Sequence, residues 1–184
     1  MNRADCESKA NEIRKQYNPL DLSPFPYKNI TDSIFELKIQ SFEFSEDSIK
    51  NLSGAITYEE KDSSGVKTYE FHIAINSSKS QERQNFTLAH ELGHYFLHKD
   101  KIKIEGIIVD SDFFDGGRAL FSLDEAEISQ MEIEANNFAY ALIMPSELIV
   151  QAWESLRDVE SCAKVFNVSV STMSIRLERL KLLP

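Results

Sequence analysis

The segment FTLAHELGHYFLH, residues 86–98, holds three of the four histidines of the chain within an otherwise apolar stretch. Its apolar residues recur every three or four positions, which is typical of a helix with one buried face. Residues four positions apart lie on the same side of a helix, one turn from each other. His90 and His94 therefore point the same way and can share one ion.

The same residues form a His-Glu-x-x-His pattern, HELGH, in which Glu91 lies beside the two histidines. On a helix this pattern is typical of a zinc hydrolase, whose glutamate acts on a metal-bound water instead of on the metal. The other interpretation is a core helix whose histidines are hydrogen-bonded to backbone carbonyl groups. The helical context favours the zinc site.

His98 is a poor third ligand for this ion. It lies eight residues beyond His90, which is about 12 Å along a straight helix. The metzincin pattern reaches a third histidine through a glycine turn, and HELGHYFLHKD lacks that turn. We therefore expect the third ligand to come from a later helix, as in zinc hydrolases with two histidines and a glutamate.

The segment MEIEANNFA offers two candidates for that ligand, Glu132 and Glu134. Since they are two residues apart, they differ by about 200° around a helix and cannot both face the ion. Glu132 is favoured because Asn136, one turn further on, is well placed to orient a zinc-bound histidine. Glu134 remains the alternative.

The secondary structure predicted for the remainder of the chain mixes helices and strands. A helix over residues 2–17 ends at a proline-rich connector. Residues rich in β-branched and aromatic side chains at 54–60 and 66–76 predict a hairpin with a loop of about five residues. Ser78 and Gln81 have the spacing of a capping box at the start of the zinc-site helix.

The second half of the chain is predicted to be mostly helical after an irregular region. Residues 99–130 include a short strand at GIIVD and a loop at DGG. Helices are expected at 125–144, ended by Pro145, and from there to Leu156. Two short helices follow around a turn at 166–168, with Ser169 as the N-cap of the last.

These elements predict an α+β fold. A small antiparallel β-sheet packs on the zinc-site helix and on the second ligand helix. Residues 1–145 would form the main domain, and residues 146–184 a helical subdomain resembling a helix-turn-helix, within the same compact unit. The chain length of 184 residues suits one domain with a proper core.

Composition limits the compartment and the partners. No apolar run reaches the roughly 18 to 20 residues of a membrane span, and the polar opening segment lacks a signal-peptide core. Cys6 and Cys162 are too few and too far apart for a disulfide framework. We expect reduced thiols and a cytoplasmic protein.

The net charge of −10 argues against a nucleic-acid partner, because phosphate contacts need basic residues. The helix-turn-helix-like tail, from Asp158 onward, carries a balance of only +1. Between residues 105 and 134 almost all charged residues are acidic, among them Asp110, Asp112 and Asp115. If this acidic stretch lies at the rim of the active-site cleft, it would attract a basic protein. The alternative interpretation is a merely solvated loop.

The motifs RQNFTLAHELGHYFLH, EIEANNFAYALIMP and CAKVFNVSVSTMSIRLERL resemble the ImmA/IrrE family of metallo-endopeptidases. The resemblance covers most of the chain. It implies a zincin-like, gluzincin-type fold, a cytoplasmic zinc protein of bacteria or their mobile elements, and cleavage of a helix-turn-helix repressor. By that resemblance the family pattern falls on the following positions: His90, Glu91, His94, Glu132, Asn136, Met144 and Pro145.

Three functions remain open at this point. The first is a zinc endopeptidase in which Glu91 is the catalytic base and His90, His94 and Glu132 hold Zn²⁺. The second is a zinc-stabilised module that regulates a repressor by binding, and the third is a DNA-binding regulator. The sequence identifies no substrate-binding residue, activation trigger or oligomeric state. For the oxyanion stabiliser it offers three candidates: Tyr95, His98 and Arg118.

Overall fold

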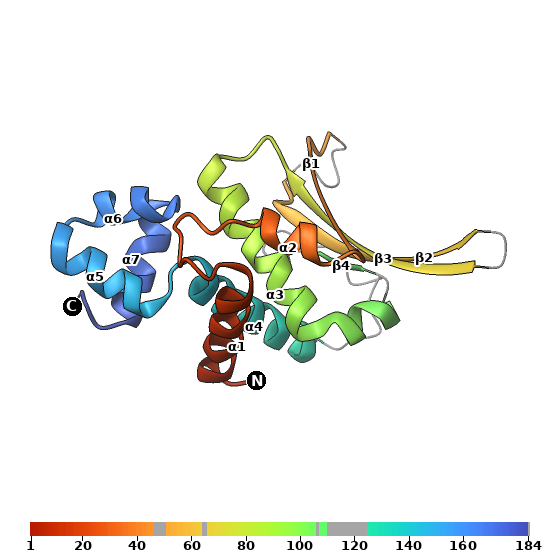
Figure 1. Cartoon of the computed structure of the whole chain (residues 1–184), viewed down its shortest axis with the longest axis horizontal. Helices are drawn as coiled ribbons and strands as arrows, with labels where there is room; N and C mark the ends of the chain where they lie inside the picture. The colour runs from red at the N-terminus through yellow and green to blue at the C-terminus, as the bar shows by residue number, and fades with distance from the viewer. Residues whose placement is uncertain (46–50, 64–65, 106, 110–124, 184) are drawn as a thin grey trace.

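The computed structural model describes residues 1–45, 51–63, 66–105, 107–109 and 125–183 (Figure 1). Its helices are α1 (Arg3–Tyr17), α2 (Lys28–Ser33), α3 (Gln81–Glu105), α4 (Glu125–Ile143), α5 (Ser146–Leu156), α6 (Val159–Phe166) and α7 (Val170–Arg179). Its strands are β1 (Leu37–Phe42), β2 (Gly54–Ser63), β3 (Val66–Asn76) and β4 (Ile107–Val109). The predicted α+β fold class is confirmed.

The four strands form one sheet in the order β1-β3-β2-β4. The hairpin β2–β3 is antiparallel and β4 pairs antiparallel with β2, whereas β1 runs parallel to β3. The sheet is therefore mixed, not antiparallel throughout as expected. The reason is that β1 is linked to β3 through the whole of β2, and this long connection lets it enter in the parallel direction.

Helix α3 lies between the sheet and α4, and α1 packs on α4 from the other side (Figure 1). This arrangement buries the middle of α3 on two sides, which explains its long apolar segment. The largest fully buried side chains include Phe71 of β3, Leu92 of α3 and Phe138 of α4. The core thus surrounds the HELGH segment.

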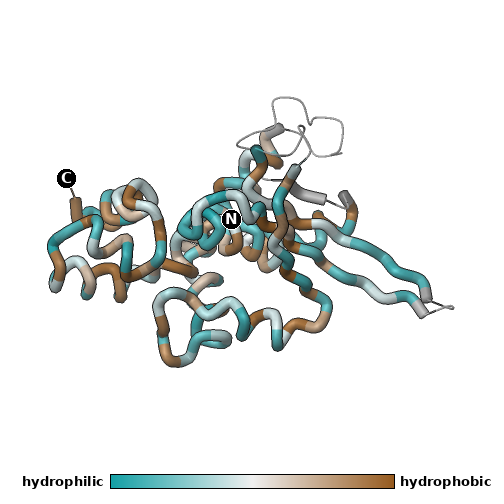
Figure 2. Tube along the Cα trace, turned by 90° about the horizontal axis from the view of Figure 1, so that it is seen from above, coloured by the Kyte–Doolittle hydropathy of each residue, from teal (hydrophilic) through white to brown (hydrophobic). Residues whose placement is uncertain are grey.

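The hairpin loop is shorter than predicted, because residues 61–63 continue β2. The distal half of the hairpin β2–β3 extends past the other two strands and projects from the body (Figure 1). Figure 2 shows that this projecting part is mostly polar, and the described side chains there are largely exposed. The backbone pairing of β2 with β3 continues through this part, and cross-strand ion pairs such as that of Lys61 with Glu70 at 2.5 Å add to it.

The helix boundaries follow from local capping, with one correction. Asn2 forms a capping box with Asp5 at the start of α1, and Ser169 caps α7 as predicted. The expected capping box at Ser78 is wrong, because α3 begins at Gln81 and Ser80 Oγ accepts the hydrogen bond from the Arg83 amide, at 3.3 Å. The hydroxyl of Ser78 instead donates to Asn76.

Two elements were not foreseen, and one is longer than expected. Helix α2 and strand β1 lie within the stretch taken as a connector. Helix α3 continues to Glu105, through residues expected to be irregular. The short strand expected at GIIVD is present as β4, and the predicted loop at residues 115–117 lies outside the described residues.

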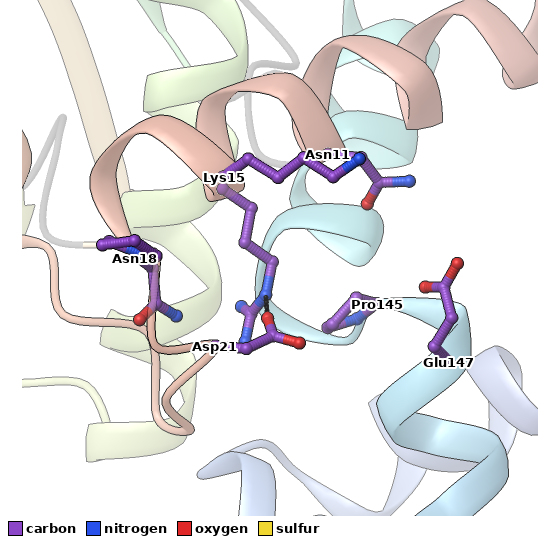
Figure 3. A pocket seen from close by; sticks show the side chains of 8 residues that line it. Asn11, Lys15, Asn18, Asp21, Pro145 and Glu147 are labelled. Atoms are coloured by element: carbon purple, nitrogen blue, oxygen red, sulfur yellow. Dashed lines mark hydrogen bonds and ion pairs between the residues drawn. The ribbon is translucent and has the colours of Figure 1, made fainter.

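Buried arginines tie the termini to the centre of the fold. The guanidinium of Arg14 donates to the carbonyl oxygens of Leu142 and Leu22, at 2.8 and 2.9 Å, and pairs with Asp21 at 2.6 Å. Arg14 and Asp21 line a pocket of about 360 Å³ between α1 and the start of α5. Figure 3 shows Asp21 in this pocket, with Pro145 and Glu147 from the start of α5. The segment after α1 is thereby fixed on α4.

Arg176 of α7 plays the corresponding part for the C-terminal helices. It is 1% exposed and donates to the Met144 carbonyl and to Glu7 of α1, both at 2.9 Å. These contacts cross the expected boundary at residue 145, and the division into two parts stays a prediction. Within the described part of the chain, no helix is both long and apolar enough to cross a membrane.

Candidate metal centre

The three residues of the HELGH pattern lie in the buried middle of α3. His90 is 3% exposed, and Glu91 and His94 are fully buried. The two histidines are one turn apart and their Nε2 atoms are 3.0 Å from each other. The helix therefore directs both ring nitrogens at one point, as the spacing predicts.

Helix α4 brings a carboxylate to the same point. Glu132 Oε2 lies 3.2 Å from His90 Nε2, and Glu132 Oε1 lies 3.3 Å from His94 Nε2. One ligand atom from each of the three residues lies within 4.8 Å of the others. Of the two glutamates that the sequence left open, the structure brings Glu132 to the histidines.

The approach of α4 to α3 depends on Gly93. A Cβ atom at this position would lie 3.0 Å from both the Cα and the carbonyl oxygen of Ala135. Real Cβ atoms rarely come so close to backbone atoms, so a side chain here would push the two helices apart. The glycine inside HELGH thus lets the histidines of one helix meet the glutamate of the other.

Asn136 orients His90 through its other ring nitrogen. His90 Nδ1 lies 3.2 Å from Asn136 Oδ1, and a carbonyl oxygen there can only accept. With the ring proton on Nδ1, the lone pair of Nε2 is available to an ion bound between His90, His94 and Glu132. The sequence placed Asn136 in this role from its one-turn spacing to Glu132.

The electrostatics of Glu132 fit a cationic neighbour. Burial raises the pKa of its carboxyl group, but the contacts with His90 and His94 outweigh burial and hold that pKa well below its usual value. The carboxylate is charged at neutral pH. Two imidazole nitrogens and one carboxylate are the donor set of a catalytic zinc site with an open fourth position.

Glu91 lies against the first residue of β2. A Cβ atom at Gly54 would lie 3.1 Å from Glu91 Oε1 and 2.5 Å from Thr87 Cγ2. Gly54 thereby leaves room for the Glu91 carboxylate between the sheet and α3. No local sequence pattern indicates this role of Gly54, because the contact joins elements that are far apart in the chain.

Glu134 pairs with His98 instead of joining the three-residue group. His98 Nε2 lies 2.9 Å from Glu134 Oε2, and both side chains are less than a tenth exposed. Burial raises the pKa of Glu134, yet contacts with Gln130, the Met1 amino group and His98 lower it to about 2. Burial lowers the pKa of His98 to about 4, so its ring is neutral at pH 7.

Of the remaining candidates from the sequence, Tyr95 lies within the described residues and is not drawn into this group. The hydroxyl of Tyr95 donates to Glu36 at 2.7 Å, away from the histidines. Arg118 and the acidic residues Asp110, Asp112 and Asp115 lie outside the described residues.

A cleft of about 480 Å³ adjoins the group on the side of Asn136. It runs between the start of α3, α4 and the start of α7. Its walls combine aromatic rings, hydroxyl groups and two guanidinium groups. They are formed by Ser80, Glu82, Arg83, Phe86, Asn136, Tyr140, Ser169, Ser171, Thr172, Ile175 and Arg179.

Comparison with known proteins places the chain in a family. A model of the IrrE N-terminal-like domain, a peptidase family, matches residues 55–178. This match covers the hairpin, both helices of the site and the C-terminal helices.

The chain belongs to the IrrE N-terminal-like domain family.

Two curated relatives are also similar to it. The radiation response metalloprotease IrrE of Deinococcus radiodurans is 35% identical over 104 residues, 54% of this chain and 28% of the relative. An uncharacterised immunity region protein 2 of Bacillus phage phi105 is 35% identical over 80 residues, 44% of this chain and 42% of the relative. The chain therefore spans less than half the length of each relative.

Membership in the IrrE N-terminal-like domain family confirms the ImmA/IrrE resemblance and the zincin-like fold. It also connects the chain with metallopeptidases and, through the phage relative, with phage immunity regions. A divalent metal is implied by a metallopeptidase family, and His90, His94 and Glu132 form a group that fits one.

Proposed function

We propose that the protein is a zinc-dependent endopeptidase. The observation that carries the proposal is the meeting of His90, His94 and Glu132 beside the buried Glu91. These three residues would hold Zn²⁺, which when bound lowers the pKa of its water to about 7 and polarises the substrate carbonyl.

Glu91, Asn136 and the cleft beside it have distinct parts in the proposed reaction. Glu91 takes a proton from the attacking water and passes it to the leaving nitrogen of the cleaved peptide bond. Asn136 holds the His90 ring in the orientation that directs Nε2 at the metal position. We assign the cleft that Asn136 lines to the binding of the substrate chain.

The proposed substrate is a regulatory protein, in particular a basic helix-turn-helix repressor. The name of the phage relative refers to an immunity region, and a net charge of −10 favours a basic partner over a nucleic acid. The cytoplasmic location expected from the two reduced cysteines belongs to the same proposal. Burial raises the pKa of both thiols, which suits unreactive residues.

A module that regulates a repressor by binding alone is the second candidate. The same three residues would then hold zinc for stability. The buried Glu91 speaks against it, because a carboxylate there costs desolvation and a purely structural zinc site has no use for a base. The third reading, DNA binding through α6 and α7, is disfavoured by the charge balance of +1 in that part of the chain.

The test compares zinc-loaded wild type with Glu91→Gln, a variant that keeps the size of the side chain and loses the base. Each protein is incubated with a bacterial protein extract that includes helix-turn-helix repressors, and new N-termini are labelled and identified by mass spectrometry. We expect new termini with wild type alone, concentrated in one repressor. If wild type and Glu91→Gln yield the same termini while both bind zinc, the binding module replaces the peptidase.

A further inference from the structure

A row of polar contacts leads away from the candidate metal site through α3 into α4. His94 Nδ1 lies 3.2 Å from His98 Nδ1, and His98 Nε2 lies 2.9 Å from Glu134 Oε2. All three side chains are less than a tenth exposed. In such surroundings each donor must meet an acceptor, because an unmatched buried polar group is costly.

One arrangement of protons satisfies the whole row. The Glu134 carboxylate only accepts, so the His98 nitrogen that faces it, Nε2, is the donor of that contact. The Nδ1 atom of His98 then carries a lone pair, which accepts a hydrogen bond from Nδ1–H of His94. This leaves the Nε2 lone pair of His94 facing His90 and Glu132, where a metal ligand needs it.

We propose that His98 is a positioning residue that, held by Glu134, fixes the tautomer and orientation of the His94 ring for metal binding. The inference rests on the proposed zinc site. It gives a second carboxylate, that of Glu134, an indirect part in that site. Glu132 meets the ion directly, whereas Glu134 acts on it through two imidazole rings. Both glutamates of MEIEANNFA thereby serve the same centre from different faces of α4.

The spacing HELGHYFLH explains how one helix can supply the row. His90, His94 and His98 are each four residues apart, so their rings lie one above the other along one side of α3. The ring centroids of His90 and His94 are 4.7 Å apart and those of His94 and His98 are 5.3 Å apart. His98 is too far along the helix to share the ion with His90. It is near enough to form a hydrogen bond with the ring of His94, which lies between them.

The first measurement is made on the zinc-loaded protein, in which the ion takes the Nε2 lone pair of His94. Long-range ¹H–¹⁵N correlation spectra report which ring nitrogen of each histidine carries the proton, and the chain has only four histidines. We expect the proton on Nδ1 in His94 and on Nε2 in His98. The opposite tautomer of His98 overturns the inference, and this test does not require peptidase activity.

The second measurement is zinc affinity, by competition with a chromophoric chelator. His98→Phe keeps an aromatic ring but removes the acceptor, and we expect about 10- to 100-fold weaker binding. His98→Gln keeps an acceptor for His94 and a donor for Glu134, so its affinity returns toward that of wild type. His72→Phe is the matched control, because His72 lies on β3 outside the site and contacts Glu70.

The outcomes separate this inference from the proposed function. If wild type and His98→Phe bind zinc equally, or if both His98 variants lose the same affinity, His98 does not act through a hydrogen bond to His94. If wild type itself binds no zinc, the proposed peptidase fails. If His98→Phe does not fold, the ring tautomers measured in wild type decide whether the inference holds.

Discussion

At the residue scale, the candidate site combines three ligand-type atoms with neighbours that control their protons. Asn136 accepts from His90, so that the nitrogen facing the metal position keeps its lone pair. Such outer contacts contribute to metal affinity because they prevent the ligand ring from rotating and from being protonated at the wrong atom. The site therefore depends on residues that never touch the ion.

Replacing Asn136 by leucine tests this dependence. The variant keeps the volume of the side chain but removes the acceptor, and we expect about 10- to 100-fold weaker zinc binding. Equilibrium dialysis against zinc buffers measures it. Asn137→Leu is the matched control, since Asn137 contacts Arg179 and not the site. Equal zinc affinities of the two variants would mean that Asn136 does not orient His90 for metal binding.

At the element scale, the site exists because two helices approach each other unusually closely. Gly93 and Ala135 form the contact, and the histidines and Glu132 lie within one turn of it. A sequence pattern can place residues on one face of one helix, but the distance between two helices is set by packing. The role of Gly93 accordingly becomes visible only in the structure.

The Gly93→Ala variant tests the close contact between α3 and α4, because the contact decides whether the variant is more or less stable than wild type. In open space, glycine to alanine inside a helix stabilises a protein by about 0.5–1 kcal/mol. Here the new methyl group meets backbone atoms, and we expect destabilisation by about 1–3 kcal/mol. Urea unfolding measures the difference. A more stable variant would mean that α3 and α4 do not depend on a glycine here.

The connection between α7 and α1 gives a pH-dependent prediction. Burial raises the pKa of Glu7, but its contacts with Arg176 and Arg3 outweigh burial, and the pKa lies below the ordinary value of 4.5. A lowered pKa stabilises the fold above pH 4.5, and this contribution is lost as the pH falls through the pKa of the folded state. Glu7 should therefore stabilise the protein at neutral pH and not in acid.

Replacing Glu7 by glutamine removes the charge while retaining the shape. We expect the variant to be about 1 kcal/mol less stable than wild type at pH 7. The difference should shrink as the pH is lowered below 4.5, which thermal unfolding of both proteins over that range would show. A difference independent of pH would contradict the ion pair with Arg176.

The structure also shows which elements a sequence can predict. Helices α1, α4, α5, α6 and α7 and the hairpin were found from periodicity, proline and caps, which are local signals. Strand β1 was missed because it is defined by parallel pairing with β3, some thirty residues away. The Glu134–His98 contact was missed for the same reason, although each residue was noted separately.

At the scale of the whole molecule, the chain combines a strong negative charge with a buried candidate site. In the proposed function, the net charge of −10 would favour a basic protein partner over nucleic acid. The C-terminal helices are held to α1 and α4 by the buried Arg176. Their position relative to α1 and α4 is thereby fixed.

Salt dependence tests the attraction between the chain and a basic substrate. We expect kcat/KM for a repressor to fall about tenfold between low and moderate ionic strength, because screening removes electrostatic steering. A short uncharged peptide that contains the cleaved bond is the control and should be nearly insensitive to salt. An equal response of both substrates would contradict charge-guided association.

The most direct test of the central claim is the zinc content of purified protein under mild chelation, measured by mass spectrometry. We expect about one zinc per chain in wild type and in Glu91→Gln. We expect loss of zinc in His90→Ala and in Glu132→Ala, because each of these variants lacks one of the three ligands. Wild type that cannot be loaded with zinc, or Glu132→Ala that retains it, would contradict the proposed centre.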